Sequence, residues 1–364
     1  MPYLLATTIR GVEKIAAHRI AEILENPRIV IKPHGFSGII LIEVEKDIDV
    51  AYELIKSEVP EVESLMRVLA EIEADPQKIA EKAAELSREN IMASETFAVR
   101  TIRRGRHNFT SIEINTLVGT RIQEVTSADV DLNYPDKVVR IDIIEDKAFI
   151  SIMKGEEEWK KLRPGKSLMR PFLSKLAIIQ TPYGGDPEGI YRVGVRIGRA
   201  VQTFEIKELV IAPYLPVDAE ELKVFIEGLV EGRDSRYRIQ VKTYSHKPHK
   251  VPISVQDLYQ LIRERRDELI IGTSTRGAPL VSVIEDIAKD IRRSSRVNIL
   301  IGSREGLPRG VLRYSDYMID VIPTVTLPTD HASTAIIMAL LTALDSIGFF
   351  EKFTYRARSK GMRE

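Results

Sequence analysis

Residues 297–308 read VNILIGSREGLP, a short apolar run that ends in a loop of glycine, small polar residues and proline. Two other apolar runs end in a similar way, LIIGTS at 269–274 and MIDVIP at 318–323. Short apolar runs that alternate with amphipathic helical stretches predict a parallel β-sheet covered by helices on both faces. We therefore expect the C-terminal half of the chain to be an α/β domain.

The same alternation extends outward from this stretch over residues 176–344. It predicts strands at 176–180, 208–213, 237–244, 269–274, 297–303 and 318–323, and helices at 193–203, 219–229, 255–267, 281–292 and 332–344. Ligands bind beyond the carboxyl ends of the strands in such sheets. A binding site is therefore expected in the loops after Ile271, Ile301 and Ile322.

These three loops are rich in glycine, proline and small hydroxyl residues. Glycine allows a close approach of the backbone to a ligand, and free amides and carbonyls can then hydrogen-bond it. One such loop would indicate only an ordinary turn, whereas three in series favour a cofactor site. The residues that we expect to bind the cofactor are Gly272, Thr273, Ser274, Gly302, Ser303, Gly306, Ile322, Pro323, Leu327, Pro328 and Ala332.

The N-terminal half has an α+β pattern in two parts. Residues 3–72 follow a βαββαβ order, with the last strand at 64–72, which is typical of a ferredoxin-like fold. The second part has a helix from Asp75-Pro76 to Asn90, a strand at 96–102, a helix capped by Thr110 and strands at 138–144 and 148–153. A charged segment with Pro164-Gly165 follows. We expect domains at 1–73, 74–154 and 173–364, with a linker at 155–172.

A cluster of basic residues lies at the end of the strand at 96–102. Arg100, Arg103, Arg104, Arg106 and His107 fall within eight residues. Lysine and arginine clusters bind phosphates and release counterions, so the cluster predicts a contact with RNA. The alternative is that the cluster lies on a solvent-exposed strand edge, where charged side chains prevent aggregation with other chains.

The overall composition excludes several classes of protein. The chain of 364 residues has 53 basic and 53 acidic residues, so a nucleic acid would have to bind local basic patches. It has no cysteine, and its six histidines show no metal-binding spacing, so we expect no metal site. No apolar run approaches the length of a membrane helix, and the first residues do not form a signal peptide. We expect a cytoplasmic protein.

The C-terminal half resembles the SPOUT superfamily, in particular its SpoU-like methyltransferases. The first motif appears as Gly194, Arg199 and Phe204 before ELVIAP, with Arg192 at the place of the family's asparagine. ILIGSREGLP resembles the second motif. The third appears as DVIP at 320–323 and TDHAS at 329–333, in which His331 replaces an asparagine.

This resemblance implies a trefoil-knotted α/β domain that binds S-adenosylmethionine, forms a homodimer and methylates RNA. It also implies catalytic roles for Arg199, Glu305, His331 and Ser333. A guanidinium is a poor general base unless a phosphate or a carboxylate assists it, so Arg199 is interpreted as a positioning group. Asp330 is either part of the site or the cap of the helix that follows.

Residues 95–151 resemble a THUMP domain, and the preceding ferredoxin-like half matches the domain that often accompanies it. The matching positions are Phe97, Arg100, Arg103, Arg106, Phe109, Ser111, Glu113, Gly119, Asp131, Pro135 and Asp136. The resemblance implies binding of tRNA at its acceptor end.

The leading hypothesis is thus a tRNA methyltransferase that uses S-adenosylmethionine, with a ribose 2′-hydroxyl or a base as the acceptor. A second hypothesis is a tRNA-binding adaptor whose cofactor pocket has decayed, because the motifs depart from the family pattern. A third is a dinucleotide oxidoreductase, which TPYGGDPEG at 181–189 supports poorly since it lacks GxGxxG.

Overall fold

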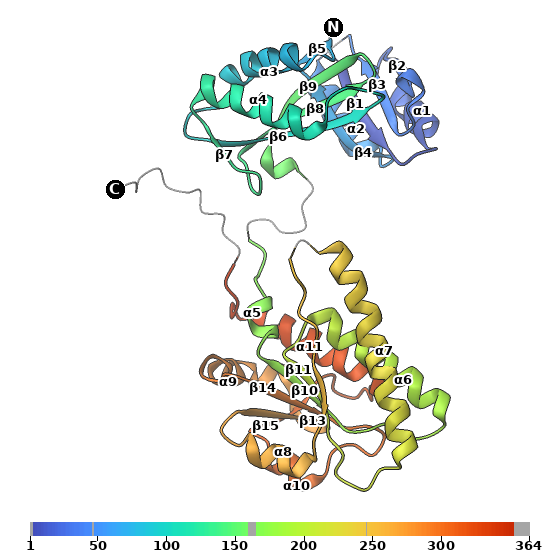
Figure 1. Cartoon of the computed structure of the whole chain (residues 1–364), viewed down its shortest axis with the longest axis vertical. Coiled ribbons are helices and arrows are strands. Elements are labelled where there is room, and N and C mark those ends of the chain that lie inside the picture. Colours follow the sequence, from blue (N-terminus) through green and yellow to red (C-terminus); the bar gives the residue numbers. More distant parts are fainter. Residues whose placement is uncertain (1–2, 46, 159–164, 245, 353–364) are drawn as a thin grey trace. The chain divides into compact units, whose positions relative to one another are not determined.

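The structure is a computed structural model that describes residues 3–45, 47–158, 165–244 and 246–352. The chain forms two compact units, an N-terminal unit within residues 1–164 and a C-terminal unit within 165–353 (Figure 1). Of the expected linker at 155–172, residues 159–164 lie outside the described residues. Each unit is described by itself below.

The first part of the N-terminal unit is a four-stranded antiparallel sheet with two helices. Its elements are β1 (Tyr3–Thr8), α1 (Glu13–Ile23), β2 (Arg28–Ile31), η1 (Pro33–Gly35), β3 (Ile39–Glu43), α2 (Ile48–Glu58) and β4 (Val62–Val68). The strand order β2-β3-β1-β4 and the βαββαβ sequence give the expected ferredoxin-like fold. Ile20 of α1 and Ile55 of α2 are fully buried against this sheet.

The second part is a five-stranded sheet in the order β5-β9-β8-β6-β7. Its elements are β5 (Ala70–Glu73), α3 (Pro76–Asn90), β6 (Thr96–Arg104), α4 (Ser111–Thr126), β7 (Asp129–Val130), β8 (Lys137–Ile144) and β9 (Lys147–Lys154), followed by η2 (Gly155–Glu157). Asp75 caps α3, and Thr110 with Glu113 forms a capping box on α4, as the sequence predicts. Helices α3 and α4 share one core with this sheet.

The two sheets of the N-terminal unit share an apolar core. Leu5 and Met66 of the first sheet pack in one cluster with Ile144 and Phe149 of the second. The predicted strand at 64–72 is wrong as a single element, because β4 pairs with β1 while β5 pairs with β9 in the other sheet. The sequence pattern could not show this change of partner, since only Leu69 separates the two strands.

A buried carboxylate holds the start of α1. Glu13 is fully buried and accepts hydrogen bonds from the amides of Gly11 (3.0 Å) and Gly38 (2.5 Å), with the ammonium of Lys32 at 3.5 Å. Burial by itself raises the pKa of Glu13, but the amide hydrogen bonds and Lys32 outweigh it and lower this pKa from 4.5 to about 2. The ionised carboxylate therefore stabilises the folded state.

This lowered pKa predicts a pH-dependent stability. The stabilisation by Glu13 is fully present above pH 4.5 and is lost as the pH falls from 4.5 toward about 2, because the unfolded chain then binds the proton first. Glu13→Gln should lower the thermal unfolding midpoint at pH 7, and the difference from the parent protein should shrink over that window. Glu22→Gln, which alters an exposed carboxylate of the same helix, is the control for calorimetry across pH. A difference that persists at pH 2 would contradict the assignment.

The C-terminal unit is built on a six-stranded sheet in which every pairing is parallel, in the order β12-β11-β10-β14-β13-β15. The strands are β10 (Leu176–Gln180), β11 (Glu208–Ile211), β12 (Ile253–Val255), β13 (Leu269–Pro279), β14 (Val297–Ile301) and β15 (Tyr317–Asp320). This confirms the α/β class expected from the alternating pattern. The trefoil knot that the resemblance implies stays a prediction.

Helices cover both faces of this sheet. They are α5 (Arg170–Leu173), α6 (Pro187–Phe204), α7 (Ala219–Thr243), α8 (Leu258–Glu264), α9 (Leu280–Arg293), α10 (Arg309–Tyr314) and α11 (Thr329–Ser346). Helices α5, α6, α7, α9 and α11 share a core with one face of the sheet, while α8 and α10 pack on the other face (Figure 1). The carboxyl edge of the sheet is thus bordered by helices from both layers.

The predicted strand at 237–244 is wrong, because residues 219–243 form the single helix α7. Gln240, within the segment misread as a strand, is fully buried. Its side-chain amide donates to the carbonyl oxygen of Gln202 (2.9 Å), and the amide of Gln202 donates back to Oε1 of Gln240 (2.8 Å). This exchange fixes the end of α7 on α6. The third strand is β12, and α8 starts only at Leu258, later than the helix predicted from 255.

Helices α6 and α7 approach each other through glycines spaced four residues apart on each helix. A Cβ on Gly198 would lie 2.1 Å from the carbonyl oxygen of Leu229, and a Cβ on Gly232 would lie 2.0 Å from that of Val195. Gly194 is also close to α7, since a Cβ there would lie 2.7 Å from the carbonyl oxygen of Phe225. The glycine of the first SPOUT-like motif therefore has a packing role.

Candidate functional site

A cavity of about 1010 Å³ lies at the carboxyl ends of β13, β14 and β15. Its walls are residues 273–276, residues 301–309 with Leu312 and Arg313 of α10, and residues 318–322 and 325–327, while Ala332 and Ile336 of α11 close one side. The three loops that the sequence predicts as a binding site thus meet at one place.

Most of the expected cofactor residues line this cavity. They are Thr273, Ser274, Gly302, Ser303, Gly306, Ile322, Leu327 and Ala332. Gly272, Pro323 and Pro328 do not line it. For Gly272 the structure offers another reason for a glycine, because a Cβ there would lie 2.9 Å from Cδ2 of Leu312 and 3.0 Å from Oγ of Ser315.

The loop after β14 turns back on itself. The amide of Gly306 donates to the carbonyl oxygen of Ser303 (2.9 Å), and the amide of Ser303 donates to Oγ1 of Thr181 (2.7 Å). Gly306 has a φ of +74°, and a Cβ on Gly302 would lie 2.4 Å from the carbonyl carbon of Gly306. Both glycines are therefore needed for this turn, and backbone forms that wall of the cavity.

Strand β13 forms a large bulge at the place where the sequence predicts the loop after Ile271. Thr273 and Ala278 both align with Ile319 of β15, so residues 274–277 leave the ladder between them. The hydroxyl of Thr273 donates to the carbonyl oxygen of Leu300 at 2.8 Å, which ties the bulge to β14. Ser274 and Arg276 are thereby placed on the cavity wall.

Two tyrosines of neighbouring loops contact residues of the cavity. Arg304 donates to the hydroxyl of Tyr183 at 2.7 and 3.1 Å, with its guanidinium 4.8 Å from the ring centroid. Burial, and then the charge and hydrogen bond of Glu305, raise the pKa of Tyr214. Tyr214 therefore keeps its proton, and Glu305 is oriented at the cavity wall. Neither tyrosine was predicted from the sequence.

The four residues predicted to be catalytic are not brought together. Glu305 lines the cavity, whereas Arg199 on α6 donates to Oγ of Ser235 on α7 at 2.6 Å. His331 is exposed in the first turn of α11. Ser333 is fully buried, and its hydroxyl has no partner among the residues that the structure describes.

The arginine that contacts α11 is Arg196, one turn before Arg199. Its guanidinium donates to Oδ2 of Asp330 at 2.6 Å, and Nε2 of His331 lies 3.9 Å from the same oxygen. Burial raises the pKa of Asp330, but the hydrogen bond from Arg196 and the charge of His331 outweigh this and lower the pKa. Asp330 does not cap α11, which starts at Thr329, so that interpretation is wrong. Its partner is 134 positions away in sequence, and no sequence spacing indicates the pair.

The basic cluster of the N-terminal unit is partly neutralised by internal contacts. Arg100 donates to Glu158 (2.9 Å), and Arg104 donates to the fully buried Asp142 (2.6 Å). Arg103 lies over the ring of Phe109 at 5.7 Å, and His107 contacts the carbonyl oxygen of Glu145 at 2.7 Å. Arg106 is exposed and has no ion pair with any residue in the described ranges. Arg103, Arg106 and His107 are thus the members without a carboxylate partner there.

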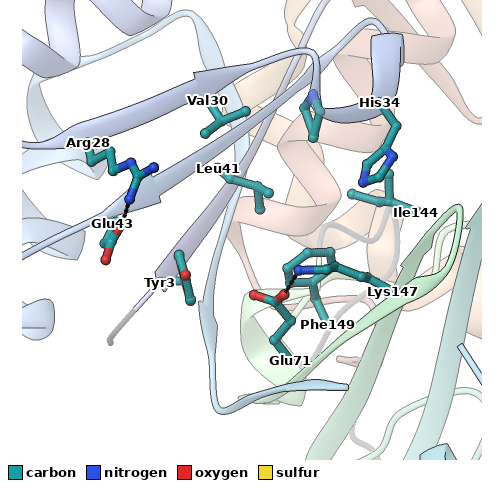
Figure 2. Close-up of a pocket in the computed structure, with 11 residues that line it drawn as sticks. Tyr3, Arg28, Val30, His34, Leu41, Glu43, Glu71, Ile144, Lys147 and Phe149 are labelled. Carbon is teal, nitrogen blue, oxygen red and sulfur yellow. Dashed lines mark hydrogen bonds and ion pairs between the residues drawn. The ribbon is translucent and has the colours of Figure 1, made fainter. Parts of the chain in front are cut away.

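A second hollow, of about 280 Å³, lies between the two sheets of the N-terminal unit. Figure 2 shows its charged side chains in pairs, with Arg28 directed at Glu43 and Lys147 directed at Glu71. Tyr3, Leu41 and Phe149 provide apolar surface between these pairs. Because Arg28 and Lys147 each have a carboxylate partner, these pairs leave no excess charge that would attract a charged ligand.

Comparison with known proteins assigns both halves. Residues 170–362 match the family model described as AF2226-like SPOUT RNA methylase fused to THUMP, and residues 73–153 match the THUMP domain. An uncharacterized protein of Methanocaldococcus jannaschii is 40% identical over 92% of this chain and 91% of its own length. A tRNA sulfurtransferase of Vibrio vulnificus is 37% identical over 35% of this chain and 29% of that enzyme.

Solved structures give only a weak likeness over the whole chain. The structure of TrmN from Thermus thermophilus has a TM-score of 0.35 at 15% identity and covers 86% of this chain and 92% of its own. A likeness at this level supports no inference about function. The family match covers more than half of the chain, and it confirms both resemblances found in the sequence. The chain belongs to the family of AF2226-like SPOUT RNA methylases fused to THUMP.

Proposed function

We propose that this protein is a tRNA methyltransferase that uses S-adenosylmethionine, with a ribose 2′-hydroxyl as the methyl acceptor. The observation that carries the proposal is the cavity at the carboxyl edge of the C-terminal sheet, in a domain of the RNA methylase family. The cavity is open, which argues against an adaptor protein with a decayed pocket. The division into domains at 1–73, 74–154 and 173–364 and a homodimer of C-terminal units are part of this proposal.

The residues of the cavity fit S-adenosylmethionine. Gly302 and Gly306 present backbone where a side chain would fill the space, so polar edges of a ligand can be hydrogen-bonded there. Ile322, Leu327 and Ile336 offer apolar surface for an adenine ring. Two hydroxyl residues also line the cavity, Thr273 of β13 and Ser303 in the loop after β14. When bound, the cofactor would supply an electrophilic methyl group, and the protein needs no covalent intermediate.

The chain's own contribution to the transfer would be to position the acceptor and to withdraw charge from it. An arginine assists a nucleophile best when a carboxylate orients it, and Arg196 has such a partner in Asp330. Ala332, two residues after Asp330 on α11, lines the cavity. We therefore add Arg196 and Asp330 to the proposed site, beside Arg199, Glu305, His331 and Ser333.

The N-terminal unit would hold the tRNA. The basic cluster contains three residues without carboxylate partners in the described ranges, Arg103, Arg106 and His107, and these can bind phosphates. Phe109 lies beside Arg103 and His107 and can stack on a base. The THUMP domain and the similarity to tRNA sulfurtransferases support tRNA as the RNA. Binding at the acceptor end, which the THUMP resemblance implies, is part of this proposal. Arg100 and Arg104 would shape the surface through their ion pairs.

The test combines calorimetry with methyl transfer. The full-length protein should bind S-adenosylmethionine, and label should pass from the methyl group to tRNA as a ribose-methylated nucleoside in mass spectrometry. Arg196→Ala should lower kcat at least tenfold with cofactor affinity unchanged, as expected for loss of a positioning group (a factor of about 10²–10⁴ is typical for acid–base groups). Arg199→Ala is the matched comparison, because Arg199 lies on the same helix but is hydrogen-bonded to Ser235. This variant should show a smaller decrease in kcat than Arg196→Ala.

Three results would revise this proposal. No binding at about 1 mM cofactor would favour the adaptor. A base-methylated product would change the acceptor atom and leave the enzyme class intact. If kcat fell more in Arg199→Ala than in Arg196→Ala, the residue that positions the acceptor would be Arg199.

A further inference from the structure

The cofactor cavity is lined by more positive charge than its own carboxylates can balance. Its walls hold four arginines and two carboxylates, Glu305 and Asp320. Arg304 is fixed on Tyr183. The side chains of the other three, Arg276, Arg309 and Arg313, are exposed and make no hydrogen bond or ion pair with any residue in the described ranges. These three residues are called the arginine rim below.

Several arginines elsewhere in the same unit have carboxylate partners, whereas Arg263 and Arg293 are exposed and have no ion pair with any residue in the described ranges. At the opposite, amino edge of the sheet, Arg265 lies 2.9 Å from Glu208, and Arg296 lies within 3.5 Å of Glu208 and Glu268. The hollow of the N-terminal unit is also balanced by ion pairs (Figure 2). The arginine rim differs from these sites because three arginines without carboxylate partners in the described ranges line one cavity.

S-adenosylmethionine cannot supply the missing negative charge. It carries a sulfonium, an ammonium and one carboxylate, so its binding adds positive charge to a cavity that already has an excess of two cations. Arginine side chains keep their charge at neutral pH, so the repulsion cannot be relieved by loss of a proton. A polyanion at the mouth of the cavity would relieve it.

The placement of the arginine rim suits a chain of phosphates. Arg309 and Arg313 are four residues apart on α10, so they share one face of that helix. Arg276 belongs to the bulge of β13 on another wall of the same cavity. Guanidinium groups bind phosphate oxygens in a bidentate manner, and successive phosphates of a strand would meet cations on both walls.

We propose that the arginine rim binds the backbone phosphates that flank the target nucleotide of the RNA. The C-terminal unit then grips RNA by itself, in addition to the contacts of the N-terminal unit. The inference rests on the proposed function, because it assumes that the nucleotide enters the cofactor cavity.

The test is a double variant, Arg309→Gln with Arg313→Gln, in the full-length protein. The affinity of this variant for tRNA at fixed salt should fall about tenfold. The association constant for tRNA should also depend less on salt, with the magnitude of the slope of log K against log salt concentration smaller by about 0.7–1 per arginine removed. The affinity for S-adenosylmethionine, measured by calorimetry, should not change. Arg293→Gln is the matched control, because Arg293 is an exposed arginine at the end of α9, where the chain leads to the amino edge of β14.

The outcomes separate this inference from the proposed function. Unchanged tRNA affinity and salt slope would overturn the inference, even if the enzyme transfers methyl groups. A loss of cofactor affinity with tRNA binding intact would also overturn it, since the arginines would then belong to the cofactor site. If the parent protein binds no S-adenosylmethionine but its tRNA binding depends on the arginine rim, the phosphate site stands and the proposed methyl transfer fails.

Discussion

Gly232→Ala should unfold the C-terminal unit at a much lower temperature than the parent protein. The new Cβ would lie 2.0 Å from the carbonyl oxygen of Val195, 2.8 Å from its carbonyl carbon and 2.9 Å from its Cα. All three are backbone atoms of α6, so no side-chain rotation relieves the overlap and the two helices must separate. Alanine favours a helix over glycine by about 1 kcal/mol, but overpacking of a core costs about 1–3 kcal/mol and more when backbone must move.

The expected net loss is therefore about 2 kcal/mol or more, measured as a shift of the urea midpoint of the C-terminal unit. Gly310→Ala is the control, because Gly310 is also helical and its Cβ would have no neighbour within 4 Å. That variant should be neutral or slightly stabilising. Equal midpoints for Gly232→Ala and the parent protein would show that α6 and α7 are further apart than in this structure.

The same glycines explain where the sequence misled. Gly228 and Gly232 lower the expected helix content of α7, and Tyr237, Ile239 and Val241 alternate with polar residues as in a strand. In the structure Ile239 and Val241 are 42% and 53% exposed, so their alternation does not mark a buried face. Packing against α6 stabilises the helical conformation of the end of α7, although the local sequence favours a strand. Sequence periodicity does not show this tertiary contact.

Features set by local chemistry were predictable. The start of α3 follows from Asp75 and Pro76, and the start of α4 follows from Thr110 and Glu113, because capping involves residues within one turn. The cavity was predictable as a place, since parallel strands bring their carboxyl ends to one edge.

Pairings between distant residues were not predictable. The Arg196–Asp330 contact joins α6 to α11, and the arginine rim collects residues from two separate segments. Neither has a spacing in sequence that indicates a contact. Arg309 and Arg313 alone carried a usable signal, since two arginines one turn apart directly follow a predicted cofactor loop.

Gly302→Ala should reduce the affinity for S-adenosylmethionine about 100-fold or more. Its Cβ would lie 2.4, 2.6 and 2.8 Å from the carbonyl carbon, the Cα and the carbonyl oxygen of Gly306. The turn must then open, and the hydrogen bond from the amide of Gly306 to the carbonyl oxygen of Ser303 is lost. Distortion of about 2–3 kcal/mol, a usual cost of an added methyl in a close-packed place, corresponds to that factor in Kd.

The effect should be confined to the cofactor, because the loop of Gly302 lies at the end of β14 and outside its pairing with β10 and β13. Calorimetry with S-adenosylmethionine measures the loss, and circular dichroism with tRNA binding checks that both units stay folded. Gly310→Ala, eight residues further on and free of close neighbours, should bind the cofactor as the parent protein does. Normal cofactor binding by Gly302→Ala would mean that this wall of the cavity does not contact the cofactor. The cofactor site would then have to be sought at the bulge of β13 and in the loop after β15.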